Sequence, residues 1–164
     1  MTVDYIVASL PALVFGEPPA ISSAAFAELC AGVGGFDPGV PGGEAWRDLE
    51  TQLRNAMAAA RGGAKYARPA RGCSIHWRDR VAACFQEGDV AKRDEMLDRV
   101  WWDAAGELTS PSDPLGKGAL ATYAVRLRIA ERRARISPEA GDAAFDALTT
   151  ATKPQVAASS GLTE

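Results

Sequence analysis

The chain is poor in histidine, cysteine and aromatic residues, and it has no long hydrophobic run. Its 164 residues include one histidine and three cysteines, and aromatic residues make up 7 %. No apolar segment approaches the roughly 20 residues that a bilayer-spanning helix needs. The first residues lack a basic region followed by an apolar stretch and a small-residue cleavage site, so we expect no signal peptide. The sequence therefore predicts a soluble protein of the cytoplasm.

The cysteines do not form a recognisable framework. Cys30, Cys73 and Cys84 are odd in number and show no C-x-x-C spacing. Such a set indicates neither disulfides nor a zinc cluster. We expect buried or half-buried thiols and no metal cofactor.

Motifs for catalysis and nucleotide binding are also missing. His76 has no acidic or nucleophilic partner tied to it by a motif, which favours a surface or capping residue over a general base. The glycine-rich spans 32–35 and 116–118 match neither the P-loop nor the dinucleotide-binding pattern. We therefore expect no enzyme and no cofactor, with an enzyme centred on His76 as an alternative.

One acidic cluster needs the same test. Asp94 and Asp98 stand four residues apart on an expected helix, with Glu95 between them, and such a set can hold a metal. The same helix carries basic residues that can pair with these acids at the surface, namely Lys92, Arg93 and Arg99. We expect a solvated charged face rather than a metal site.

The composition that is present is that of an ordinary globular domain. Hydrophobic residues make up 47 % of the chain, charged residues 24 %, and the formal net charge is −3. The length suits one domain with one core. A weakly acidic balance gives no whole-molecule attraction to nucleic acid or to an anionic membrane.

Apolar residues recur every three to four positions over most of the chain, which predicts an all-α, single-domain bundle of about five to six helices. The helices expected run from Ser22 or Ser23 to Val33, Glu44 to Ala60, Ser74 to Phe85, Asp89 to Leu108 and Leu115 to Ile136, with a short one after Ser137 that carries Phe145 and Leu148. The run 5–11 is either a short strand or a helix. The domain is expected to span 1–152, with a flexible tail over 153–164.

Each expected helix has an apolar stripe that should face the core. The stripes are Phe26, Leu29, Cys30 and Val33; Trp46, Leu49, Leu53, Ala56 and Ala60; Trp77, Val81, Cys84 and Phe85; Val90, Leu97, Trp101, Ala104 and Leu108; and Leu120, Tyr123, Leu127, Ala130 and Ala134. Asp113 followed by Pro114 is expected to begin the last of these helices.

Two adjacent tryptophans, Trp101 and Trp102, cannot both face one narrow seam, because neighbouring helical residues point about 100° apart. Trp101 lies on the stripe, so it should pack inward while Trp102 lies at the edge or in an interface. The alternative is a helix with neighbours on both sides, which would bury both.

Arginine dominates the helix 115–136, where Glu131 is the one acid. Like charges on one helix repel unless acids meet them. Those acids can come from Glu139, Asp142 and Asp146 downstream, from a partner protein or from nucleic acid. Our candidate interface residues are Arg126, Arg128, Arg132, Arg133 and Arg135, together with Trp102 and Tyr123. Reversing the charge of Arg128 and Arg132 should then weaken partner binding with little effect on thermal stability.

A second basic segment lies in the middle of the chain. Residues 61–72 contain Arg61, Lys65, Arg68 and Arg71 without an acid, which predicts a mobile basic loop. A helical regulatory domain that binds nucleic acid through Arg61 to Arg80 and the long helix is therefore the alternative function.

Four segments carry a family resemblance. They are Tyr5-Ile6-Val7-Ala8-Ser9-Leu10-Pro11-Ala12-Leu13, Ser22-Ser23-x-x-Phe26-x-x-Leu29-Cys30, the block from Lys92 to Trp102, and Leu120-x-x-Tyr123-x-x-x-Leu127-x-x-x-Glu131-x-x-Ala134-Arg135. They resemble a family of uncharacterised bacterial proteins encoded among the subunits of V-type ATPases. The Lys92–Trp102 block is more faintly similar to a repeat of the V/A-type ATPase C/d subunit, the helical cap of the central stalk.

This resemblance implies a non-catalytic accessory or central-stalk-like subunit that binds other V-type ATPase subunits. It places the chain in the cytoplasm or at the inner face of the membrane through that complex. The chain departs from the C/d subunit in having tryptophans for the aromatic pair. It also has about half the length that a three-fold repeat requires.

Overall fold

The computed structural model describes residues 2–136, 141–143 and 145–150 of the chain. Over these residues it is all helical, as expected, and its one β-type pairing is an isolated bridge between Ser110 and Asp113. The helices are α1 (Val3–Ser9), α2 (Ser23–Cys30), α3 (Gly43–Ala60), α4 (Ile75–Cys84), α5 (Val90–Ala105) and α6 (Lys117–Ala134), with the 3-10 turns η1 (Ala64–Tyr66) and η2 (Gly106–Leu108).

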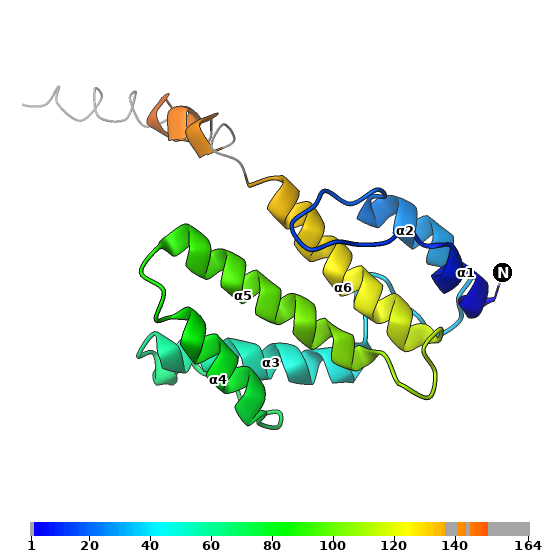
Figure 1. Cartoon of the computed structure of the whole chain (residues 1–164), viewed down its shortest axis with the longest axis horizontal. Coiled ribbons are helices and arrows are strands. Elements are labelled where there is room, and N and C mark those ends of the chain that lie inside the picture. Colours follow the sequence, from blue (N-terminus) through cyan, green and yellow to red (C-terminus); the bar gives the residue numbers. More distant parts are fainter. Residues whose placement is uncertain (1, 137–140, 144, 151–164) are drawn as a thin grey trace, which may run out of the picture.

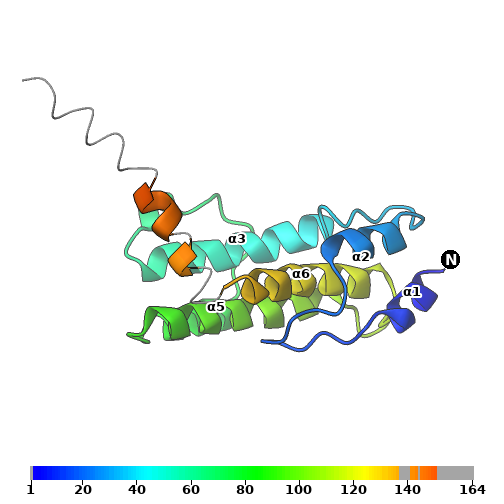
Figure 2. The ribbon, with the colours of Figure 1, turned by 90° about the horizontal axis from the view of Figure 1, so that it is seen from above.

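Helix α5 lies in the middle of the molecule. It contacts α3 and α4 on one side and α6 on the other, and α1 and α2 cover α6 from outside (Figures 1 and 2). Two apolar clusters follow from this order. One joins α3, α4 and α5 around Leu53, Val81 and Leu97. The other joins α1, α2 and α6 around Phe26 and Leu127.

Side-chain caps begin three of the helices where the sequence predicts them. Ser22 accepts a hydrogen bond from the backbone N–H of Ala25 at 3.2 Å, and Ser74 accepts one from Trp77 at 3.4 Å. Asp89 accepts from Ala91 and Lys92. Each cap satisfies a backbone donor that has no partner within its own helix.

The N-terminal run is a helix, so the strand alternative is wrong. Ile6 is 1 % exposed in the cluster with α6, and Val3, Val7 and Leu10 pack beside it. These positions are three and four residues apart, which puts them on one helical face. The helix ends just before Pro11, because the residue ahead of a proline is disfavoured in helical geometry.

Helix α6 begins at Lys117, three residues after the expected Pro114. The intervening residues turn instead, with the N–H of Gly116 donating to the Asp113 carbonyl at 3.3 Å. A Cβ built on Gly118 would lie 2.1 Å from the Leu108 carbonyl oxygen, so the first turn of α6 packs directly on backbone. This contact joins the first turn of α6 to the end of η2.

Some residues expected to face the core are exposed. Val90 is 67 % exposed, and Ala60 and Ala134 are exposed too, because all three are end residues of their helices. Leu29 is 42 % exposed, because the apolar residues that α2 buries in the cluster with α6 are Phe26 and Cys30.

The last expected helix lies partly outside the described residues. Its start at Ser137 and the tail 153–164 fall outside them. The described residues 141–143 and 145–150 are helical, and Phe145 and Leu148 are 67 % and 69 % exposed. None of the described helices combines the length and apolar character needed to cross a membrane.

Candidate interface residues and a basic hollow

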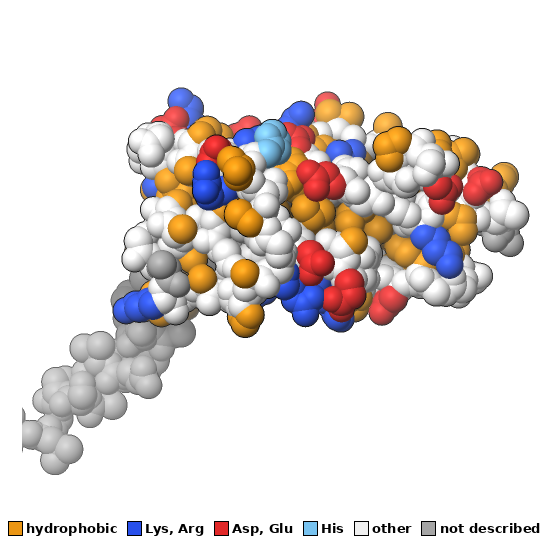
Figure 3. Space-filling view, turned by 90° about the horizontal axis from the view of Figure 1, so that it is seen from below, with side chains coloured by type: hydrophobic (Ala, Val, Ile, Leu, Met, Phe, Trp, Pro, Cys, Tyr) orange, Lys and Arg blue, Asp and Glu red, His pale blue; other side chains and the backbone are white. Residues whose placement is uncertain are grey.

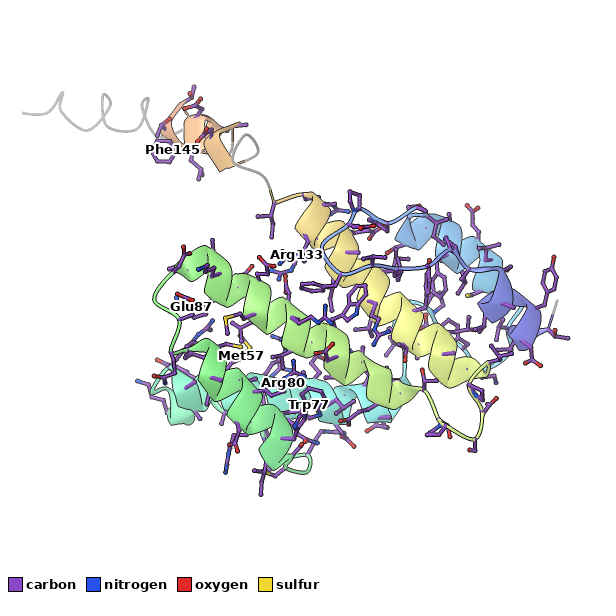
Figure 4. The ribbon with its side chains drawn as sticks, viewed as in Figure 1. Met57, Trp77, Arg80, Glu87, Arg133 and Phe145 are labelled. Atoms are coloured by element: carbon purple, nitrogen blue, oxygen red, sulfur yellow. The ribbon has the colours of Figure 1, made fainter. Side chains whose placement is uncertain are left out.

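Arg132 and Arg133 of α6 are held by acids of α5. Asp98, 5 % exposed, accepts hydrogen bonds from both arginines, at 3.3 Å for Arg133. Asp94 and Glu95 lie 3.6 Å from Arg132 and Arg133 respectively. Figure 4 shows Arg133 between the two helices. The acids of α5 thus neutralise part of the arginine set of α6.

The expectation that these acids pair with basic residues of their own helix is therefore wrong. Asp94, Glu95 and Asp98 reach across to α6 rather than to basic residues of their own helix, where Arg99 pairs with Asp103 at 3.2 Å. Among the described residues, Asp142 and Asp146, proposed as partners, form no ion pair with these arginines. Glu139 lies outside the described residues, and Asp142 and Asp146 are exposed. No group of acids, cysteines and histidine suited to a metal occurs in the part of the chain that the structure describes.

The two tryptophans pack on opposite sides of α5. Trp102, not Trp101, is the more buried, at 6 % exposed. Its ring meets Phe15 edge-on, with centroids 5.5 Å apart. Trp101 faces α3, where Trp46 meets it at 5.8 Å. The expectation that Trp102 lies at an edge or in an interface is therefore wrong. The alternative, a helix with neighbours on both sides, holds, with Trp102 buried and Trp101 half-buried.

Arg126 supports Trp102 from α6. Its Nε donates to the Trp102 carbonyl at 3.0 Å, and its guanidinium lies 5.2 Å from the centre of the indole ring. Burial lowers the pKa of Arg126, and the nearby carboxylate of Asp103 acts against that shift. Arg126 and Trp102 therefore form an internal contact.

Of the remaining candidate interface residues, two are exposed and one packs inside the fold. Arg128 is exposed and donates to the carbonyls of Pro38 and Gly39 at 2.6 and 3.0 Å. Arg135 is exposed at the end of α6. Tyr123 stacks on Phe26 at 5.2 Å, and burial raises its pKa.

Residues 61–72 lie against α3 instead of projecting as a loop. Asn55 donates to the Arg68 carbonyl at 3.0 Å and accepts from the Arg68 N–H at 2.8 Å. Gln52 donates to the Arg71 carbonyl at 2.9 Å. The Arg71 side chain pairs with Glu44 at 2.7 Å. Amide side chains of α3 thus hold the segment along the helix.

A hollow of about 450 Å³ opens between the end of α3 and this segment. Its lining includes Arg54, Arg61, Arg68 and Tyr66. The sequence singled out Arg61 and Arg68 but not the other two. A signal for Arg54 was present, because it lies seven residues before Arg61 and two helical turns bring both to one face.

His76 lies exposed on the first turn of α4, on the face shown in Figure 3, where acidic and basic side chains are interspersed. Its ring meets Trp77 edge-on at 4.6 Å. Within the described residues no hydrogen bond joins an acidic side chain to its ring. Comparison of the chain with protein-family models, with curated proteins and with solved structures found no match.

Proposed function

We propose that the chain is a non-catalytic, protein-binding subunit of a bacterial V-type ATPase, held at the cytoplasmic side of the membrane through that complex. The observation that carries the proposal is spatial. The four sequence segments that resemble the ATPase-linked family fall mainly on α1, α2, α5 and α6, and α1, α2 and α5 each pack on α6. The resemblance therefore follows one structural unit.

Residues of these segments make the contacts that hold the unit together. Ser23 donates to Glu131 through its N–H at 2.6 Å and its hydroxyl at 2.7 Å, which ties α2 to α6. Asp98 ties α5 to Arg132 and Arg133. Ser23, Glu131 and Asp98 belong to the segments of the resemblance, whereas Arg132 and Arg133 fall between the matched positions of the last segment. The resemblance therefore includes part of each of these contacts.

The same unit offers an apolar surface at one end. Helix α1 and the start of α6 lie together at that end, and α2 runs antiparallel to α6, so that its last residues point the same way (Figure 1). Helix α1, helix α2 and the turn that precedes α6 each expose a large apolar residue: Tyr5 is 62 %, Leu29 42 % and Leu115 43 % exposed. Exposed apolar and aromatic side chains are typical of protein interfaces.

The test is co-purification. The tagged chain is expressed together with the V-type ATPase subunits of the same bacterium, purified through its tag and examined by mass spectrometry. We expect ATPase subunits at a fixed ratio to the chain. Recovery of the chain without them would contradict the proposal.

Matched variants locate the surface. The double substitution Tyr5→Glu and Leu29→Glu should lower recovery of the ATPase subunits while the thermal midpoint stays close to that of the wild type. The control is Ile75→Glu with Val90→Glu, which changes two apolar residues that are 62 % and 67 % exposed on α4 and α5. Equal loss with both pairs would mean that this end is not the interface.

A further inference from the structure

We propose that the hollow beside the C-terminal end of α3 binds an acidic peptide segment of a partner protein. This inference rests on the proposed protein-binding function and names a second surface for it. The hollow is separate from the apolar end, because it is built by α3 and the residues that follow it.

Positive charge gathers at the hollow without matching acids. Arg54, Arg61 and Arg68 line it, and Lys65 lies in η1, next to the lining residue Tyr66 in the sequence. Arg54 is bonded to Glu50 at 2.8 Å. In the described part of the chain no ion pair reaches Arg61, Lys65 or Arg68, so three cations remain for an external anion.

The arginines of the neighbouring stretch differ in this respect. Arg71 pairs with Glu44 and Asp48, Arg78 with Asp79, and Arg80 with Asp103. The residues between 61 and 80 therefore divide into a paired half and an unpaired half. The unpaired half lies at the hollow.

The helix end accounts for only part of this charge. Arg61 is the C-cap of α3, where a cation interacts favourably with the backbone carbonyls. It also lies 5.6 Å from the centre of the Phe85 ring. Lys65 and Arg68 lie beyond the helix, so neither is explained by its dipole.

The hollow is preformed. Gly62 turns the chain with a φ of 70°, and the N–H of Gly63 donates to the Ala58 carbonyl at 2.8 Å. The two hydrogen bonds between Asn55 and the backbone of Arg68 close the other end. Because this backbone is already ordered, ligand binding costs less free energy for ordering the protein.

Its walls suit a peptide. Met57 and Ala58 supply an apolar side, and Tyr66, 74 % exposed, supplies an aromatic rim with a hydroxyl. Guanidinium groups form paired, charge-assisted hydrogen bonds to carboxylates. Glutamate or aspartate beside an apolar residue therefore fits the lining.

A nucleic acid fits less well. A phosphate backbone needs positive charge that continues along the surface. Here Glu44, Asp48 and Glu50 interrupt the positive charge along α3. The site accommodates a few acidic side chains rather than a long polyanion.

The test uses the purified full chain and a fluorescein-labelled peptide of glutamates with one central leucine. Fluorescence anisotropy should show saturable binding that weakens with salt. The variant Arg61→Ala with Arg68→Ala should raise the dissociation constant about tenfold or more, because it removes two charge-assisted contacts. The control Arg47→Ala with Arg78→Ala removes the same charge elsewhere and should change it less than about twofold.

Circular dichroism confirms that each variant is folded, and Tyr66→Ala is the second probe, since its ring is largely exposed. Absence of peptide binding, equal loss in both arginine pairs, or binding of a labelled oligothymidine in place of the peptide would overturn the proposal. The proposed function fails separately. If the wild-type chain co-purifies with no ATPase subunit, that function fails, whereas full co-purification without peptide binding overturns only the acidic-peptide site.

Discussion

Asp98 shows how one residue links two helices. It is nearly buried, while its partners Arg132 and Arg133 have side chains that are 50 % and 21 % exposed. Leaving a buried charge without its partner is costly, whereas an exposed ion pair contributes little. Asp98 and Arg133 therefore contribute most of the stability that this cluster provides.

This asymmetry makes a prediction. Asp98→Ala should lower the free energy of unfolding by about 3 kcal/mol, at the low end for a broken buried pair because water reaches Arg132. Arg132→Ala should cost about 1 kcal/mol. Urea unfolding measures both, and equal losses would contradict the account. Arg132→Glu should also be destabilising, since it places a carboxylate beside Asp98, contrary to the expectation that reversing this charge has little effect on thermal stability.

The cysteines make a second prediction at this scale. Cys30 and Cys84 are buried, and burial raises the pKa of each thiol, whereas Cys73 is exposed. A thiol reagent should therefore label one cysteine in the folded chain and all three in denaturant. Cys73→Ser removes the fast reaction, and rapid labelling of a second thiol in the native state would be inconsistent with this packing.

Between elements, the contact of α2 with α6 depends on an ionised Glu131. Burial alone would raise the pKa of Glu131, but the hydrogen bonds from Ser23, with the charges of Arg135 and Arg128, lower it below its usual range. An acid with a lowered pKa in the folded state adds stability above its unfolded pKa. That stability is lost as the pH falls through the folded pKa.

We therefore expect part of the stability to disappear on acidification below about pH 4.3, the ordinary pKa of a glutamate. Glu131→Gln should remove this part of the pH dependence, and Glu131→Ala should cost about 2 kcal/mol near neutral pH. Urea unfolding over a pH series checks both. If the glutamine variant loses as much stability at low pH as the wild type does, other carboxylates cause the loss.

The junction of α6 with η2 gives a prediction with a built-in control. Alanine is favoured over glycine by about 1 kcal/mol inside a helix. At Gly118, however, the added Cβ meets the Leu108 backbone. Gly118→Ala should therefore destabilise the fold by about 1–3 kcal/mol. Gly32→Ala, whose Cβ meets nothing within 4 Å, should be close to neutral. A stabilised Gly118→Ala would contradict the close packing.

Across the whole molecule, local patterns predicted the helices and their caps. The caps Ser22, Ser74 and Asp89 could be predicted because each hydrogen bond joins residues only two or three positions apart in the sequence. The neighbours of each helix were not predictable in this way. The pairing of Asp98 with Arg132, 34 residues away, and the two-sided packing of α5 depend on tertiary contacts that periodicity does not encode.

For the candidate surfaces too, the sequence predicted the local features but not the tertiary contacts. Composition picked out the arginines of α6 and of 61–72, since charge can be counted along a chain. It did not show that Asp98 holds Arg132 and Arg133, or that Arg54 and Tyr66 complete the basic hollow. Which cations are left without a partner is a property of the folded molecule.

The central claim is that this chain acts as a subunit. Its most direct test is to purify the V-type ATPase of the same bacterium through a tag on its catalytic subunit and to quantify this chain in the assembled complex. We predict that it is present at a constant ratio to the tagged subunit after gel filtration. An intact ATPase that elutes without it would contradict the account.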